Sequence, residues 1–416
     1  MSVFEIGAFL IGLAALFGYI NYRFLRVPHT IGLVLIALAA SSVLLLVEAV
    51  FPAADVDSLI TGVLERIDFH ETLMHGMLSF LLFAGALHVD FSALRRRYRT
   101  IGLLATLGTL VSTLLIAGGT WILAGVAGHP IPFIWALVFG ALISPTDPVA
   151  VLGIFERVRV PPTLKATLAG ESLFNDGMGV VVFTVVLGIA VQGSDPGLLR
   201  IGELFVVEVL GGLVLGLIGG FIGYRALLRI NDPNLAVLVT LAIVMVGYAV
   251  AIRLDVSGPI AMVVAGLFVG NEGMNYAVSE GSGDYLKEFW SLLDNILNSV
   301  LFLLIGLEVL IIARTGFTFW VGFIVIPVTV ASRWLSVVLG TTLLRRWEIF
   351  GNAAVTVLTW GGLRGGIAVA LALSLPANEY RPFILSITYV VVLFSIIVQG
   401  LTVTRVVERV MPPDPR

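Results

Sequence analysis

Thr146 and Asp147 stand between two prolines in an otherwise apolar stretch. The stretch reads "SPTDP" and covers residues 144–148, with Pro145 and Pro148 on either side of the Thr-Asp pair. Because proline has no N–H, the carbonyl four residues before each proline loses its helical donor. Freed carbonyls, a hydroxyl and a carboxylate are hard oxygen ligands that suit Na⁺ or Li⁺, as oxygen cages suit other hard cations. We therefore expect Thr146 and Asp147 to bind a cation. The alternative is an ordinary Asx-Pro turn between two short helices.

A second polar group lies in the next apolar segment, in "GESLFNDG", residues 170–177. Ser172 and Asp176 are four residues apart, and so are Glu171 and Asn175, so a helix would place them in two neighbouring stripes. One stripe offers a hydroxyl and a carboxylate to a cation, and the other offers a carboxylate and an amide to an arginine. The alternative is that "NDG" forms a turn at a loop tip, but a long apolar run follows it.

Two arginines also fall inside apolar segments, where an unpaired charge is costly. Arg333 has no acid nearby in the sequence, so we expect it to pair with Glu171 from another helix, with Asn175 as a bridge. Arg364 lies in a glycine-rich break, "WGGLRGG", where a cation can stabilise the carbonyl end of a half-helix. The alternative for both arginines is snorkelling from a helix end to the membrane surface. Three further acids fall inside expected helices without an assigned role: Glu208, Asp294 and Glu308.

The composition of the chain identifies the elements that must position these residues. Of its 416 residues, 58% are hydrophobic and 12% are charged, and the mean hydropathy is +1.05. A soluble protein would carry about 25% charged residues. The long apolar runs therefore predict an integral membrane protein built from helices rather than a barrel. The absence of cysteine excludes disulfides, thiol catalysis and zinc–thiolate sites.

Breaks in hydrophobicity divide the chain into about thirteen expected transmembrane helices. They lie at roughly 3–20, 30–50, 70–88, 101–127, 131–155, 163–192, 201–228, 234–252, 257–271, 286–312, 317–344, 350–375 and 381–404. An odd number places the two ends of the chain on opposite sides of the membrane. With the N-terminus outside, seventeen Lys and Arg residues fall on the cytoplasmic side and five outside. By the positive-inside rule, this predicts a multi-pass protein of the cell membrane with a cytoplasmic C-terminus.

The two halves of the chain resemble each other. "LLFAGALHV" in the third segment is similar to "FLLIGLEV" in the tenth, and helix-breaking clusters occur in the fifth and twelfth. Both offsets are seven spans, which means that the halves run in opposite directions. Inverted repeats with interrupted helices at corresponding positions indicate a secondary transporter whose site lies near the membrane midplane. We expect an all-α polytopic fold in which two interrupted helices cross.

Three motifs in order, "SPTDPVAV", "GESLFNDG" and "WGGLRGGIA", resemble the monovalent cation/proton antiporter superfamily, and specifically its NhaP-type branch related to the animal sodium/proton exchangers. The resemblance covers essentially the whole chain. It implies a single antiporter membrane domain over residues 1–416, without a soluble regulatory domain, that acts as a homodimer. It also implies a transport bundle (about residues 101–192 and 317–404) and a dimerisation scaffold (about residues 3–88 and 201–312).

The resemblance further implies roles for single residues. Asp176 is then the principal carboxylate for cation and proton, Asp147, Thr146 and Ser172 are further ligands of Na⁺ or Li⁺, and a structural polar cluster is formed by Glu171, Asn175, Arg333 and Arg364. The Asn175–Asp176 pair is similar to the branch that exchanges one cation for one proton, which serves sodium transport and pH homeostasis. No cofactor and no nucleic acid are implied, and lipid is the only other partner. Some relatives carry a glutamate where this chain has Ala84, and the effect of that difference is open.

The expected mechanism is competition. Two neighbouring carboxylates in a low dielectric cannot both remain bare, so they bind either a cation or protons. Moving a bare carboxylate past an apolar barrier is costly, which makes exchange by alternating access obligatory. K⁺ in place of Na⁺ is the main alternative within this class. A passive cation channel or an intramembrane aspartyl protease is the alternative from another class, although the protease would need a Gly-x-Gly-Asp context that Asp176 lacks.

Overall fold

The computed structural model describes most of the chain, namely residues 3–50, 72–147, 151, 155, 160–193, 197–271, 282–312, 319–345 and 351–411. Pro148 and parts of the expected segment at 131–155 lie outside the described residues, as do residues 272–281 between the ninth and tenth expected segments. Within the described residues the chain forms helices and no strand; its one isolated β-bridge joins two interrupted helices. The all-helical fold predicted from composition is therefore confirmed.

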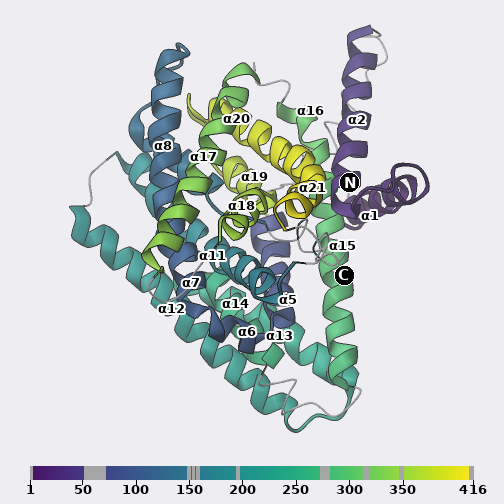
Figure 1. Ribbon diagram of the computed structural model, residues 1–416. Coiled ribbons are helices and arrows are strands. Elements are labelled where there is room, and N and C mark those ends of the chain that lie inside the picture. Colours follow the sequence, from purple (N-terminus) through teal and green to yellow (C-terminus); the bar gives the residue numbers. More distant parts are fainter. Residues whose placement is uncertain are drawn as a thin grey trace.

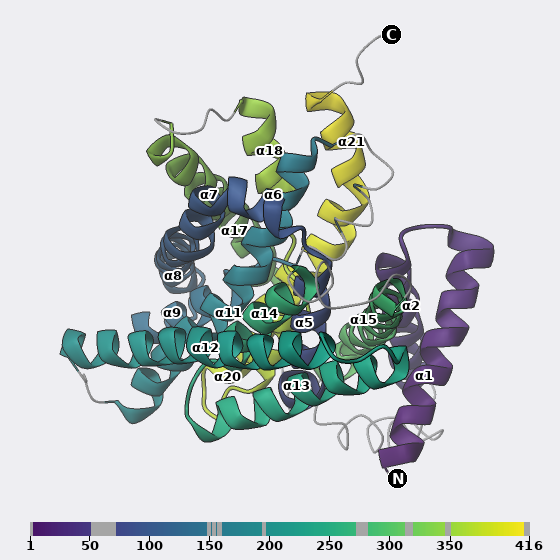
Figure 2. The same cartoon turned by 90° about the horizontal axis from the view of Figure 1, so that it is seen from below.

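One group of helices packs around α14. Helices α5, α12 and α13 contact α14, and α15 lies between α2, α5 and α13. Figure 1 shows α2 and α15 side by side along one edge of the molecule, and Figure 2 shows α12 and α13 lying across one face. The bounds of this group are α1 (Val3–Ile20), the π-helix η1 (Asn21–Leu25), α2 (His29–Val50), the π-helix η3 (Thr72–Met77), α5 (Leu78–His88), α12 (Gly197–Leu227), α13 (Pro233–Arg253), α14 (Gly258–Phe268), α15 (Ser282–Leu307) and α16 (Val309–Ile312).

The second group of helices packs around α8 and α17. Helix α8 contacts α9 and α17, α17 contacts α18 and α20, and α11 contacts α9 (Figure 1). The bounds of this group are α6 (Phe91–Arg96), α7 (Tyr98–Leu103), the π-helix η4 (Leu104–Gly108), α8 (Thr109–Val126), α9 (Phe133–Ile143), α11 (Pro162–Gln192), α17 (Phe319–Leu343), α18 (Asn352–Trp360), α19 (Gly366–Leu373), α20 (Arg381–Phe394), the π-helix η6 (Ser395–Gln399) and α21 (Gly400–Val410). The expected division into a transport bundle and a scaffold remains a prediction.

Nine helices in the described part of the chain are long and apolar enough to cross a membrane, and three shorter apolar helices accompany them. The three shorter ones are Leu78–His88, Phe133–Ile143 and Gly258–Asn271. The expected segment at 350–375 is the interrupted pair α18 and α19. Each expected segment thus contains described helix, which in the segment at 131–155 is α9, while the total of thirteen crossings remains a prediction.

Local sequence signals explain several helix ends. Asp232 accepts hydrogen bonds from the backbone N–H of Asn234 at 2.8 Å and of Leu235 at 3.4 Å, and so caps α13, whose first residue is Pro233. An acidic N-cap satisfies N–H groups that have no helical partner, and proline loses nothing at the first position. The C-terminal end of α11 is set by Gly193, which takes a left-handed conformation with φ of 64°. Glycine in this conformation commonly ends a helix.

Small residues allow α12 and α14 to approach closely. Gly212, Gly216 and Gly220 are spaced by four residues along α12, and a methyl group on any of them would overlap atoms of α14 or of its cap, Ser257. Within lipid, association between helices depends on such close packing because no hydrophobic force distinguishes a neighbouring helix from the lipid tails. This contact ties α12 firmly to the group around α14.

Candidate functional site

The two interrupted helices meet at a short backbone contact. Helix α9 ends at Ile143, and the chain continues through Pro145 to Asp147 in extended form. The N–H of Asp147 donates to the carbonyl of Leu363 at 2.7 Å, and the two residues form an isolated antiparallel bridge. Leu363 lies in the glycine-rich break between α18 and α19. Non-helical backbone at membrane depth is tolerated when it is buried in protein or lines a cavity, and here it does both.

Arg364 lies at this crossing and is 3% exposed. Its guanidinium Nη1 donates to the carbonyls of Ser144 and Pro145, the latter at 3.0 Å. Its backbone N–H donates to the Ser395 Oγ at 2.8 Å. The carbonyl end of a half-helix carries partial negative charge, so a buried guanidinium stabilises it. Arg364 is therefore placed where it neutralises the end of α9, and it does not snorkel.

The Asp147 and Asp176 side chains share one cavity of about 650 Å³. Asp176 lies on α11 and is 7% exposed. The Asp147 side chain lies against Gly365, where an added methyl group would overlap it. On α11, Gly179 gives similar room to Pro145. Two glycines thus set the position of the interrupted segment, and two carboxylates from successive segments reach the same space.

Hydroxyl and amide groups join the interrupted segment to α11. The hydroxyls of Thr146 and Ser172 are 2.9 Å apart and hydrogen-bonded. The Asn175 Oδ1 accepts from the backbone N–H of Thr146 at 3.2 Å, and its Nδ2 donates to the Thr146 Oγ1 at 2.9 Å. All three side chains are buried, each 1% exposed. This network fixes Thr146 beside Asp147 without using either carboxylate.

The contacts of Asn175 correct the expectation that it bridges Glu171 and Arg333. Both polar atoms of its side chain bond Thr146, and no hydrogen bond joins it to Arg333 within the described residues. The sequence spacing placed Asn175 and Glu171 in one stripe of a helix, but a helix bundle surrounds α11 on several sides. Asn175 faces the interrupted segment, while Glu171 faces α17.

Glu171 and Arg333 form a buried ion pair. The Arg333 Nη1 contacts the Glu171 Oε1, and the Nη2 donates to the Glu171 Oε2 at 2.9 Å. The same Nη2 donates to the Leu358 carbonyl at 3.0 Å near the end of α18. The side chains are 7% and 1% exposed for arginine and glutamate. This fork-to-fork geometry pairs both terminal nitrogens of Arg333 with the Glu171 carboxylate and joins α11, α17 and α18.

The cavity also reaches charged residues near its edge and on α15. Its wall includes His88, Asp90 and Lys165 on one side and Asp294 and Asn298 on the other. Asp90 caps α6, and its hydrogen bonds from the Ser92 hydroxyl and backbone N–H hold the pKa of its carboxyl below the usual range. We did not assign Asp294 from the sequence. Polar residues recur at helical spacing along α15, which marks one face of that helix. Spacing alone does not show that this face points toward the site.

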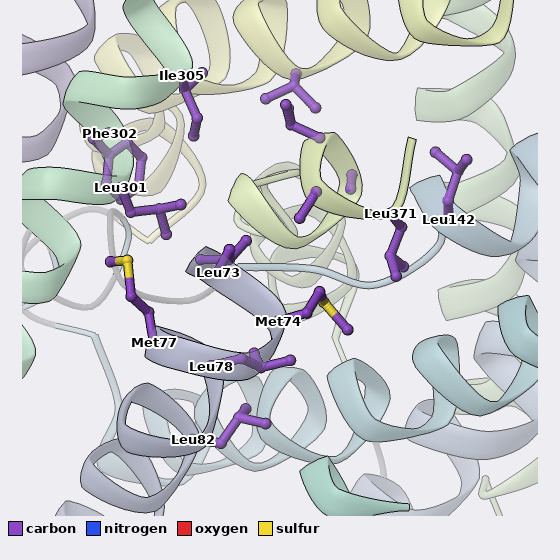
Figure 3. Packing of buried hydrophobic residues seen from close by; sticks show 14 of the residues in the cluster. Leu73, Met74, Met77, Leu78, Leu82, Leu142, Leu301, Phe302, Ile305 and Leu371 are labelled. Carbon is purple, nitrogen blue, oxygen red and sulfur yellow. The ribbon is translucent and has the colours of Figure 1, made fainter. Parts of the chain in front are cut away.

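An apolar wall closes the cavity beyond the carboxylates. Leu73, Leu78, Leu82 and Leu301 line it from η3, α5 and α15. Figure 3 shows these side chains grouped with Leu371 of α19 and other buried residues. Leu301 lies directly on Gly366, where an added methyl group would overlap it. The cavity thus has polar residues and packed leucines in its wall. Within the described residues no group of three or more His, Cys, Asp or Glu could hold a metal ion as a resident cofactor.

Comparison with known proteins gives consistent matches over almost the whole chain. Residues 11–409 match the family model described as "Sodium/hydrogen exchanger, transmembrane". The chain is 45% identical over 416 residues to the Na⁺/H⁺ antiporter NhaP of Pseudomonas aeruginosa, covering 99% of this chain and 98% of that protein. It is 33% identical over 393 residues to the Na⁺/H⁺ antiporter NhaH of Halobacillus aidingensis, covering 93% of each. The structure of the sodium proton antiporter MjNhaP1 from Methanocaldococcus jannaschii at pH 8 has a TM-score of 0.77 and 21% identity, covering 99% of this chain and 100% of that one. This last likeness shows the fold.

Proposed function

Because the chain belongs to the transmembrane sodium/hydrogen exchanger family, we propose that it is a secondary antiporter that exchanges Na⁺ for H⁺ across the membrane. The observation that carries this proposal is the single cavity into which Asp147 and Asp176 both project. Both relatives named above are called Na⁺/H⁺ antiporters, which favours Na⁺ over K⁺ as the cation. Membership of a transporter family also argues against the channel and the protease.

Cation and proton compete for the two carboxylates. The two buried arginines are occupied by other groups, because Arg333 is held by Glu171 and Arg364 by backbone carbonyls. A bare carboxylate in the membrane interior costs several kcal/mol. The pair therefore carries one cation in one direction and one proton in the other. One charge exchanged for one charge makes the cycle electroneutral.

The oxygen ligands of the cation come from two elements. The carboxylates of Asp147 and Asp176 supply charge, and the hydroxyls of Thr146 and Ser172 supply neutral oxygen. Hard monovalent ions such as Na⁺ and Li⁺ prefer such all-oxygen surroundings. Glu171, Asn175, Arg333 and Arg364 position these ligands and do not bind the ion; their own hydrogen bonds are directed elsewhere.

Alternation requires the bundle to move against the scaffold. In this proposal the bundle covers about residues 101–192 and 317–404, and the scaffold about residues 3–88 and 201–312. The leucines in Figure 3 belong to both parts and form the barrier on one side. With the N-terminus outside and the C-terminus inside, the polar wall near Asp90 faces the cytoplasm. The protein lies in the cell membrane, and a second copy pairs through the scaffold to form a homodimer.

Exchange can be measured with a pH-sensitive dye in proteoliposomes that hold a proton gradient. We expect dequenching on addition of Na⁺ or Li⁺ and little with K⁺. Asp176→Asn should abolish the response, because it leaves one carboxylate that can no longer alternate between cation and protons at the paired site. Glu203→Gln, an exposed position on α12, is the matched control and should behave as the wild type. Substantial Na⁺-dependent proton flux through the Asp176→Asn protein would refute the assignment.

A further inference from the structure

A polar stripe on α15 forms one wall of the cavity. Ser291, Asp294, Asn295 and Asn298 follow one another at spacings of three, one and three residues, so they share a face of the helix, and all four line the cavity. One turn deeper, the same face becomes apolar at Leu301. Charged and amide groups within a membrane segment are costly unless they face water or a ligand. The stripe ends where the leucine barrier begins.

One of these side chains lacks a partner that buried polar groups normally have. The Asn298 side chain is 4% exposed, and its Nδ2 has no hydrogen-bond partner within the described residues. Asp294 lies one turn away on the same face of α15, and the Asn298 side chain faces it. Buried polar groups in proteins are nearly always hydrogen-bonded. An unsatisfied amide one turn from a carboxylate, both on the wall of a cavity, therefore indicates a space that water or a hydrated ion fills.

The charges around the cavity favour a cation. Four carboxylates line it, those of Asp90, Asp147, Asp176 and Asp294, against the single ammonium of Lys165. The remaining titratable group is His88, on α5 across from α15, whose Nδ1 lies 2.7 Å from the Ala84 carbonyl. A cleft of one charge sign with low-dielectric walls concentrates counter-ions. For an anion, the four carboxylates outweigh the single ammonium.

We propose that Asp294, together with the side-chain oxygens of Ser291 and Asn298, forms a second and weaker cation site on the scaffold wall of the cavity. An incoming Na⁺ keeps part of its water, binds there first, and passes to Asp147 and Asp176. One carboxylate and two neutral oxygens suit a partly hydrated monovalent ion rather than a resident metal. The role in loading rests on the proposed exchange of Na⁺ for H⁺, but the binding itself does not.

The direct test measures Na⁺ binding to purified protein in detergent. The background is Asp147→Asn/Asp176→Asn, which removes the charge of the main site. We expect this double variant to retain weak Na⁺ binding, detected by retention of radioactive Na⁺ or by calorimetry, and we expect the further change Asp294→Asn to remove it. Glu288→Gln, on the exposed side of the same helix, is the control and should leave the weak binding intact. Equal binding with and without Asp294, or no binding in the double variant, would overturn the proposal.

A transport measurement supplies the second test and separates a site from general attraction. In the otherwise wild-type protein, Asp294→Asn should raise the apparent KM for Na⁺ about tenfold, at the lower end of the range by which charged clefts enrich ions, and more than it lowers the maximal rate. Asp294→Glu should restore most of the affinity. Attraction at long range disappears when the Debye length falls to about 3 Å at about 1 M salt. A KM effect that vanishes in choline chloride at that concentration would overturn the site. If the wild type shows no exchange, the proposed function fails, while the binding test still decides this site.

Discussion

Breaking the buried pair of Glu171 and Arg333 should destabilise the protein far more than breaking an exposed pair. Two unit charges about 4 Å apart attract by about 4 kcal/mol at an effective dielectric constant of about 20. The side chains are 7% and 1% exposed, and each also donates or accepts a second bond within the pair. Removing one partner leaves the other charge buried, which typically costs about 3–5 kcal/mol. We expect Glu171→Gln and Arg333→Met each to lower the free energy of unfolding by about this amount.

The assay is equilibrium unfolding in mixed micelles, arranged as a double-mutant cycle. The double variant should lose less free energy of unfolding than the sum of the two single losses, by at least about 2 kcal/mol. The reason is that each single variant leaves one buried charge unpaired, whereas the double variant leaves none. The control cycle uses Arg200 and Glu203, which are 2.8 Å apart but 57% and 59% exposed. That cycle should give less than about 0.5 kcal/mol. Losses at residues 171 and 333 that add within about 0.5 kcal/mol would refute the reasoning.

Three further predictions concern the site and its surroundings. Gly365→Ala and Gly179→Ala should each lower the exchange rate by about tenfold, because overpacking by one methyl group costs about 1–3 kcal/mol and displaces Asp147 or Pro145. The control is Gly188→Ala, on the same helix as residue 179 but with open space around it, which should leave exchange unchanged. Equal effects at residues 179 and 188 would contradict this prediction. The apparent affinity for Na⁺ should fall as the pH falls, because protons compete for the two carboxylates, and a rate that keeps rising in acid would contradict simple competition. The cap at Asp90 should contribute about 1 kcal/mol to the free energy of unfolding. Since hydrogen bonds lower the pKa of its carboxyl, this contribution is present above the ordinary pKa and is lost as the pH falls through the lowered value. The stabilities of Asp90→Ala and the wild type, measured by unfolding, should therefore converge at low pH.

Much of the site follows from the sequence because few residues can compensate a charge in lipid. An arginine without a nearby acid must find one on another helix, and Arg333 pairs with Glu171 as expected. Two prolines must interrupt a helix, and at Pro145 the chain leaves helical form before Asp147 bridges to Leu363. In each case one physical requirement leaves a single solution. The family resemblance added the expected grouping of the segments into a transport bundle and a scaffold.

Other features depend on how each helix is rotated about its axis, which spacing does not determine. The four-residue spacing correctly placed Asn175 and Glu171 near one another, but it could not tell that Asn175 faces Thr146. The polar stripe that contains Asp294 had the same limitation, because its direction depends on how α15 packs against α2 and α5. The π-helical turns, such as η4 at Leu104–Gly108, left no mark in the apolar pattern. These features arise from packing between segments far apart in the chain.

The bridge between Asp147 and Leu363 has a consequence for the direction of transport. Backbone groups more than two hundred residues apart are fastened by one hydrogen bond, and Arg364 secures the same junction from the side. In the proposed exchange cycle, a site fastened in this way keeps its arrangement of ligands while it faces first one aqueous phase and then the other. Its intrinsic preference for sodium over hydrogen ions is then equal on both faces. The direction of net exchange then depends only on the concentration ratios of Na⁺ and H⁺ across the membrane, and exchange can run in either direction.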